Sequence, residues 1–293
     1  MKLKEILELS RWKEHVFYVV PLSLLGVILG ANETNTGIDF RVIWLVSANI
    51  MANAFAFMFN DIEDAADDAK DKNKKQRNPI SAGRISRKEG IQATKAVLAL
   101  SVLFYSLCGI LPLLTGTSIL ILSHLYSWKS LRLKSIPVVD IVSHVLMLGT
   151  LLVYSGFTVY SSHLSAIWLI GMAVALFSTY GQLYNQYRDY ENDKEAGLNN
   201  TASLLNETVL KRLMNSAAVI GGITLVIAVW EGYFPHWLFV PLTFGAIASF
   251  YIKPNKFMGI STSDKTASAQ LQTLIPLNIV VFSWFLYEVI RNF

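Results

Sequence analysis

Long apolar stretches alternate with short polar stretches along the whole chain. Nine of the apolar stretches are long enough, or nearly so, to cross the roughly 30 Å hydrocarbon core of a bilayer as helices of about twenty residues. The fourth is the shortest. The pattern predicts an all-α, multi-pass membrane bundle. The expected spans lie near residues 16–32, 41–60, 94–113, 115–128, 137–159, 164–185, 213–231, 236–253 and 268–289.

The composition supports a membrane protein. Of the 293 residues, 53% are hydrophobic and 16% are charged, and the mean hydropathy is positive. A soluble domain usually carries about 25% charged residues, so this chain is too apolar for that class. The single cysteine, Cys108, lies in an apolar run and can form no disulfide within the chain. The first fifteen residues are charged and amphipathic, which predicts a helix on the membrane surface rather than a cleavable signal peptide.

Lysine and arginine are distributed unevenly between the connections on the two sides of the bundle. With the N-terminus inside, only Arg41 and Arg291 of the 25 basic residues fall on the outer side. Because positive charge is retained on the cytoplasmic side of membrane proteins, this asymmetry predicts the orientation of the chain. It also supports an odd number of spans.

Acidic residues gather in two clusters, each at the cytoplasmic end of a predicted span. Six lie within residues 61–71, after the second span, and four lie within residues 189–195, after the sixth. Both clusters contain the pattern N-x3-D-x3-D, and the two copies start 125 residues apart. Side chains spaced by four residues share one face of a helix, so each copy would present a column of oxygen atoms. The columns consist of Asn60, Asp64 and Asp68, and of Asn185, Asp189 and Asp193.

Clustered carboxylates at a membrane boundary indicate a bound cation, because they repel one another and are costly to desolvate without one. Ligands that are all oxygen atoms suit a hard cation, and Mg2+ commonly combines one or two carboxylates with the phosphate oxygens of a substrate. Bases near both clusters would meet that anion, which predicts a diphosphate site where Mg2+ and arginine stabilise the departing group. These bases are Lys72, Arg77, Arg84, Arg188 and Lys194.

Simpler interpretations apply to several of these features. A charged run between two spans is usually a solvated loop, and the first cluster taken alone fits that interpretation as well as it fits a binding site. The second copy favours a shared site, because an unrelated loop has no reason to repeat the Asn-Asp-Asp register. His124 and His144 lie within spans four and five, where a lone histidine more often bonds to a neighbouring helix, so we assign them no role.

Two other classes of membrane protein are alternatives. A cation transporter can carry acidic motifs in two halves, but it usually places them near the membrane midplane on broken helices. Here the motifs stand at span ends, beside bases that would repel a permeating cation. A CDP-alcohol phosphotransferase is a second Mg2+-dependent membrane enzyme, but its glycine- and arginine-containing acidic signature is missing from the chain.

Four segments resemble those of a known family. NDIEDAADD, residues 60–68, resembles the NDxxDxxxD signature of the UbiA superfamily of intramembrane prenyltransferases, and DYENDKEAG, residues 189–197, resembles its second motif, DxxxD. RNPISAGRIS, residues 77–86, resembles the Arg/Pro-containing loop of that family, and YSWKSLRLKSIPVVD, residues 126–140, resembles its tyrosine and basic segment. The chain departs from the family at Asn78, which separates arginine from proline.

The resemblance implies a single domain over residues 1–293, with nine helices around a central cavity and a cytoplasmic cap formed by the two aspartate-rich loops. It implies two Mg2+ ions held by Asn60, Asp64, Asp68, Asn185, Asp189 and Asp193. The implied catalytic residues are Asp61, Asp64, Asp68, Asp189 and Asp193, with Asp61 as a supporting ligand or proton acceptor. The candidate contacts of the diphosphate are Arg77, Tyr126, Lys129, Arg132, Lys134, Arg188 and Lys194.

The reaction that the resemblance implies is Mg2+-dependent transfer of an isoprenyl group from an allylic isoprenyl diphosphate to a lipophilic acceptor, such as a quinone precursor, an ether lipid or a carotenoid. An electron-rich acceptor would capture the allylic carbocation, and an apolar bundle would exclude the water that quenches it. The expected partners are the donor, the acceptor and the bilayer, with no nucleic acid. The expected location is a prokaryotic cell membrane, with the active site facing the cytoplasm.

Overall fold

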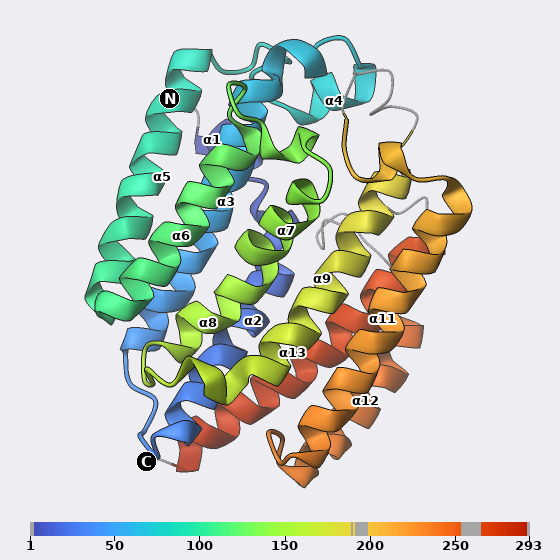
Figure 1. Ribbon diagram of the computed structural model, residues 1–293. Helices are drawn as coiled ribbons and strands as arrows, with labels where there is room; N and C mark the ends of the chain where they lie inside the picture. The colour runs from blue at the N-terminus through green and yellow to red at the C-terminus, as the bar shows by residue number, and fades with distance from the viewer. Residues whose placement is uncertain (1–2, 189, 191–198, 253–264, 292–293) are drawn as a thin grey trace.

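The computed structural model describes residues 3–188, 190, 199–252 and 265–291, the last range without the side chains of residues 265–272. The described chain is a bundle of long helices whose axes run roughly parallel (Figure 1). The long segments are α2 (Trp12–Glu33), α3 (Arg41–Asp68), α5 (Arg87–Cys108), α6 (Ile110–Ser127), α7–η2–α8 (Val139–Val145, Leu146–Thr150 and Leu151–Phe157), η3–α9 (Leu164–Ile167 and Trp168–Arg188), α11 (Glu207–Trp230), η5–α12 (His236–Leu238 and Phe239–Tyr251) and α13 (Lys265–Arg291). The short elements are α1 (Leu3–Leu9), α4 (Lys72–Arg77), η1 (Leu133–Ser135) and η4 (Ala202–Leu204).

Each of the nine expected spans has a long helical segment at its place in the described chain. Eight of these segments are long and apolar enough to cross a membrane, and the segment His236–Tyr251 is apolar but shorter. The eighth span is therefore the short one, and the prediction that it would be the fourth is wrong. The all-helical membrane bundle itself is confirmed.

The boundary between the third and fourth spans differs from the expected one near residue 114. Helix α5 ends at Cys108 and α6 begins at Ile110, because Gly109 between them has φ 122°, in a region of backbone space that favours glycine. Pro112 then lies in the first turn of α6, where a missing backbone N–H costs no helical hydrogen bond. The turn therefore needs only one residue, and the fourth span gains length at its start.

Helices α2 and α8 approach each other closely through glycine. A Cβ atom on Gly26 would lie 2.0 Å from the carbonyl oxygen of Val153, and one on Gly156 would lie 2.3 Å from the carbonyl oxygen of Ser23. Small residues allow such approach, which supplies the van der Waals packing that holds helices together where apolar lipid replaces water. Helix α2 also packs on α3 and α13, and α3 packs on α5 and α6, so α2 and α3 lie at the centre of the contacts.

A buried polar network joins four helices around Asn49 of α3. The Asn49 amide donates to the hydroxyl oxygens of Ser23 at 2.7 Å and Ser155 at 3.0 Å, and its carbonyl accepts from Tyr105 at 2.5 Å. All four side chains are buried. Because the amide uses both donors and shares its acceptor, the network is satisfied within the protein, which specifies how α2, α3, α5 and α8 pack.

We expect Asn49→Leu to destabilise the bundle by about 1–3 kcal/mol, since it leaves buried hydroxyls without their partner. Thermal unfolding of the purified protein in detergent measures the change. Ser118→Ala is the matched control, because the Ser118 hydroxyl bonds only to its own helix at Leu114 and is exposed. Equal melting temperatures for the two variants would contradict a stabilising network.

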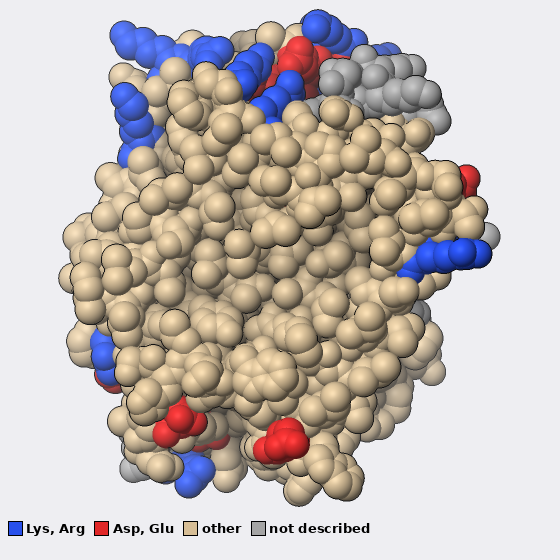
Figure 2. Space-filling view, viewed as in Figure 1, with Lys and Arg blue, Asp and Glu red and all other residues tan. Residues whose placement is uncertain are grey.

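Basic side chains gather at one end of the bundle (Figure 2). This is the end where α1 and α4 lie, together with the segment of residues 128–138 after α6. We call it the charged end. The first acidic motif, at the last turns of α3, also lies there, so acids and bases meet on one face of an otherwise apolar molecule.

Candidate active site

The first acidic motif lies on one uninterrupted helix. Helix α3 continues through residue 68, so Asn60, Asp64 and Asp68 follow each other at four-residue intervals on one face, as the spacing predicts. Asp71 then caps α4, because its carboxylate accepts from the backbone N–H groups of Asn73 at 2.7 Å and Lys74 at 2.9 Å. The capped turn brings the chain back toward the end of α3.

Two bases of the segment 128–138 reach this column. The ammonium group of Lys134 donates to Asn60 Oδ1 at 2.8 Å and to Asp64 Oδ2, and Arg132 donates to Asp64 Oδ1 at 3.2 Å. Ser127, the last residue of α6, donates to the same Asn60 oxygen at 3.0 Å. The predicted diphosphate contacts Arg132 and Lys134 are thus brought to the first motif.

The Lys134 contacts show that the oxygen atoms of Asn60 and Asp64 converge on one cationic group. The Lys134 side chain is only 11% exposed. Burial lowers the pKa of Lys134, while the neighbouring Asp64 carboxylate opposes that lowering. A position where two oxygens meet a positive charge is chemically suited to a hard cation as well.

Asp68 is held by a residue that the sequence analysis noted only as a departure from the family. The Asn78 amide donates to Asp68 Oδ2 at 2.9 Å and to the Asp61 carbonyl oxygen at 2.8 Å, and Asn78 is fully buried. Its own Oδ1 accepts from the Ile80 backbone at 3.0 Å. Asn78 therefore fixes the third member of the column against the loop that follows α4.

Asp61 forms an ion pair with Arg11, which lies in the turn between α1 and α2 that we call the N-terminal turn. Its carboxylate has no exposure, and both its oxygens accept from Arg11, with Nε to Oδ2 at 3.2 Å. Arg11 lies between α1 and α2 and also stands over the Phe57 ring at 5.7 Å. This arrangement gives Asp61 a structural partner, whereas its predicted part in catalysis stays a prediction.

Other predicted diphosphate contacts pair with acids outside the column. Arg77 donates to Glu14 Oε1 at 3.2 Å, and Lys129 Nζ lies 3.8 Å from Asp67 Oδ2. Arg84, one of the bases after the first cluster, pairs with Glu5 at 3.1 Å and with Glu8. Glutamates of α1 and α2 thus neutralise two arginines that the sequence analysis placed near an anionic substrate.

The second motif is described only in part. Asn185 and Arg188 lie in the last turns of α9, Arg188 being exposed, while Asp189, Asp193 and Lys194 lie outside the described residues. Tyr126, a predicted diphosphate contact, accepts from Gln182 of α9 at 3.2 Å. Helix α9 therefore touches the segment that begins at Tyr126, which brings the end of α9 toward the bases near the first motif.

A complete set of metal ligands would need both motifs. Within residues 3–188, 190 and the other described ranges, no three His, Cys, Asp or Glu side chains lie close enough together to hold a metal ion. The first motif contributes two carboxylates and one amide, and the remaining predicted acids are Asp189 and Asp193. The oxygen column is thus half of the metal site that the sequence predicts.

A family model describes most of the chain. Residues 19–274 match the UbiA prenyltransferase family, a range that includes both acidic motifs and the basic segment between them. The chain belongs to the UbiA prenyltransferase family. It is therefore an enzyme of the prenyltransferase class, as its motifs predict. No match is found among curated proteins.

Solved UbiA structures share the fold over nearly the full length. A UbiA homolog from Archaeoglobus fulgidus, bound to GPP and Mg2+, is 21% identical with a TM-score of 0.73, covering 98% of this chain and 99% of that one. A homolog from Aeropyrum pernix K1 is 18% identical with a TM-score of 0.67, covering 95% and 98%. A digeranylgeranylglyceryl phosphate synthase structure is 18% identical with a TM-score of 0.64, covering 98% of both chains. These TM-scores establish a common fold.

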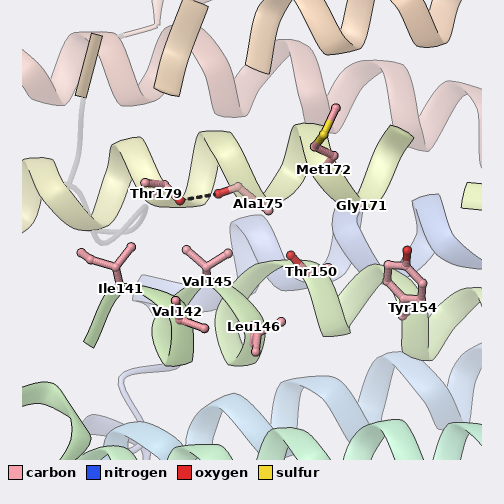
Figure 3. A pocket seen from close by; sticks show the side chains of 10 residues that line it. All are labelled: Ile141, Val142, Val145, Leu146, Thr150, Tyr154, Gly171, Met172, Ala175 and Thr179. Carbon is pink, nitrogen blue, oxygen red and sulfur yellow. Dashed lines mark hydrogen bonds between the residues drawn. The ribbon is translucent and has the colours of Figure 1, made fainter. Parts of the chain in front are cut away.

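An apolar hollow of about 340 Å³ lies between α7–α8 and α9 of this UbiA-family bundle (Figure 3). Its lining is mainly hydrocarbon, and the Thr179 hydroxyl is already used within α9, donating to the Ala175 carbonyl at 2.8 Å. Ile141 at one end follows directly on Asp140, and Tyr154 marks the other end. The hollow suits a hydrocarbon chain and offers no charge for a diphosphate. The lining residues are Ile141, Val142, Val145, Leu146, Thr150, Tyr154, Gly171, Met172, Ala175 and Thr179.

Asp140 ends the segment of residues 126–140 but was given no role from the sequence, and its carboxylate is fully buried at the start of α7. A signal for it exists in the sequence. Between residues 72 and 188 the UbiA-family chain has only two acids, Glu89 and Asp140. An isolated acid at the edge of a predicted span is costly unless it has partners, so it marks a position with a specific role.

Proposed function

We propose that this protein transfers an isoprenyl group from an allylic isoprenyl diphosphate to a lipophilic acceptor, with Mg2+, at the charged end of the bundle. The convergence of Asn60 and Asp64 on the Lys134 ammonium, beside Arg132, carries the proposal. Oxygen atoms that gather a cation and bases that can meet an anion stand within hydrogen-bonding distance of each other. A metal–diphosphate complex requires both.

The UbiA relatives support the same ligands. The Archaeoglobus fulgidus homolog has been solved with GPP and Mg2+ and with DMAPP and Mg2+. An isoprenyl diphosphate of either kind joins an anionic head to an apolar chain. The charged end and the apolar helices of this chain match those two parts.

We assign Mg2+ to Asn60, Asp64 and Asp68, together with the predicted ligands Asn185, Asp189 and Asp193 of the second motif. Six oxygen-bearing side chains are enough for two ions that also take phosphate oxygens and water, because Mg2+ keeps several ligands outside the protein. When bound, the metal would supply the positive charge that stabilises the diphosphate as it leaves.

The protein's own residues complete the reaction. Arg132 and Lys134 would hold the diphosphate through charge-assisted hydrogen bonds. They would lose little by turning from Asp64, since a bound Mg2+ ion would neutralise that carboxylate. The allylic C–O bond breaks with its electron pair going to the diphosphate. The acceptor forms the new bond to the allylic carbon and then loses a proton to the released diphosphate. The surrounding apolar helices exclude water, which would otherwise trap the cation.

The membrane placement is part of the proposal. Basic residues gather at the charged end, and such residues remain on the cytoplasmic side, so we place the active site at the cytoplasmic face of a prokaryotic cell membrane. A lipophilic acceptor, such as a quinone precursor, an ether lipid or a carotenoid, would then arrive from the bilayer. No observation favours the transporter or the phosphotransferase.

We expect Lys134→Gln to raise the KM for the isoprenyl diphosphate at least tenfold, since hydrogen bonds from a charged donor are worth about 1.5–3 kcal/mol. Arg77→Gln is the comparison. Because Arg77 pairs with Glu14 and its side chain is 53% exposed, we expect a smaller rise in KM. Steady-state assays at saturating Mg2+ measure both values. A larger effect at Arg77 would show that it leaves Glu14 to bind the donor.

Diphosphate release tests the proposed function directly. The purified protein is given dimethylallyl, geranyl, farnesyl or geranylgeranyl diphosphate, with Mg2+ or with EDTA, and with or without a membrane lipid extract. We expect release that requires Mg2+ and increases with the extract, whose prenylated component identifies the acceptor. The absence of both diphosphate release and Mg2+-dependent donor binding, in all of these conditions, would refute the proposal.

A further inference from the structure

Asp140 accepts hydrogen bonds from three different parts of the chain. Its Oδ2 accepts from the Thr201 backbone N–H at 2.8 Å and from Gln186 Nε2 at 2.5 Å. Its Oδ1 accepts from the Thr201 hydroxyl and from the Ile141 backbone N–H at 2.8 Å. Four donors on two oxygens satisfy a fully buried carboxylate, which compensates much of the cost of burying its charge.

The partners of Asp140 lie next to the second acidic motif in the chain. Gln186 follows Asn185 in the last turns of α9, and Thr201 begins the turn into η4. Gln186 and this turn are also joined to each other, because Gln186 Oε1 accepts from the Ala202 backbone N–H at 3.1 Å. One carboxylate therefore joins the end of α9, at Gln186, to the turn at Thr201.

The same carboxylate lies only six residues beyond Lys134. The intervening chain is held in an unusual conformation, since Val138 has φ 69°, which a β-branched residue rarely adopts. The Val138 backbone N–H donates to the Thr201 hydroxyl at 2.7 Å, and that hydroxyl in turn donates to Asp140. The strained turn is thus tied to the chain that follows the second motif.

We propose that Asp140 is a positioning residue, which holds the end of α9, where the predicted ligand Asn185 lies, against the segment that carries Lys134, so that the two motifs can bind Mg2+ together. This inference rests on the proposed function. Metal affinity depends on how firmly the ligands are oriented by groups behind them, and losing such a group typically costs about 10–100-fold in affinity or activity. The hydrogen bonds of Asp140 reach Gln186 and Thr201, so it acts on the motif through these two residues.

A carboxylate is required at this place because every group around it is a donor. An asparagine would direct an NH2 group at one of these donors, where a hydrogen bond is replaced by a repulsive contact. Asp140→Asn therefore keeps the side-chain volume but breaks the set of hydrogen bonds that joins Asp140 to Gln186 and Thr201. Thr201→Val is a milder variant that removes the hydroxyl bonds to Asp140 and Val138 but leaves the Thr201 backbone bond.

The experiment uses the full-length purified protein and two readouts of Mg2+ dependence. One is diphosphate release from geranylgeranyl diphosphate as a function of Mg2+ concentration. The other is the rise in melting temperature that Mg2+ produces in the presence of inorganic diphosphate, which needs no turnover. Asp39→Asn is the matched control, because Asp39 is an acid outside the charged end whose carboxylate pairs with Arg41 and Tyr160.

We expect Asp140→Asn to raise the half-saturating Mg2+ concentration at least tenfold in both readouts, and Thr201→Val to raise it less. The Asp39→Asn value should equal that of wild type. A merely structural role would lower the melting temperature and leave the half-saturating concentration unchanged, which would overturn the inference. If Asp140→Asn does not fold, Thr201→Val decides by the same criterion. Lack of Mg2+ dependence in wild type would instead count against the proposed function.

Discussion

Asp64→Asn is expected to lower Mg2+-dependent diphosphate release at least about a hundredfold, since electrostatic stabilisation of a leaving anion is commonly worth that much or more. Within the oxygen column, Asp64 pairs with two bases of the described chain, Lys134 and Arg132. The substitution removes a carboxylate from the proposed metal site. Release of diphosphate by the purified protein, with Mg2+ varied over a wide range, measures the loss.

The matched control for this prediction is Asp71→Asn. Asp71 belongs to the same acidic cluster but caps α4, and asparagine is an equally good cap, so we expect activity close to that of wild type. Alanine at Asp64, Asp68, Asp189 or Asp193 should likewise abolish turnover while the bundle stays folded. An Asp64→Asn protein with unchanged Mg2+ dependence and more than a tenth of the wild-type rate would remove Asp64 from the site.

The long helices could be predicted from the sequence because length and hydrophobicity decide them. Apolar stretches must bond their backbone groups internally in lipid, so each stretch became a helix close to its expected place. The four-residue spacing of Asn60, Asp64 and Asp68 predicted a shared face, because the helix period alone places such side chains together, and the continuous helix α3 provides it. The turn at Gly109 was missed, because a single glycine within an apolar run gives only a weak signal.

The pairing of acids with bases could not be predicted in the same way. The charged end holds many bases, and nothing in their spacing distinguishes Lys134, which meets the first motif, from Arg77, which meets Glu14. These pairs join residues about 60 or more positions apart, so the fold must exist before they can be known. Asn78 and Asp140 were given no role from the sequence, because amides and lone acids become informative only through the donors and acceptors around them.

The second large effect is expected at the N-terminal turn. Arg11→Met should lower the free energy of unfolding by about 3–5 kcal/mol, the usual cost of leaving one member of a buried ion pair without its partner. The Asp61 carboxylate has no exposure and the Arg11 side chain is 13% exposed, so water can do little to replace the lost guanidinium. Thermal or denaturant unfolding in detergent measures the change. Arg77→Met is the control, because an ion pair with an exposed arginine contributes only about 0–1 kcal/mol.

The double variant Arg11→Met/Asp61→Asn separates the two parts that Asp61 could play. It removes the buried charge together with its partner, so we expect most of the stability lost in Arg11→Met to return. If Asp61 is also a metal ligand or proton acceptor, the stable double variant will lack Mg2+-dependent activity. If Asp61 only anchors the N-terminal turn to α3, activity will recover with stability. A double variant as unstable as Arg11→Met would contradict the ion pair as the cause.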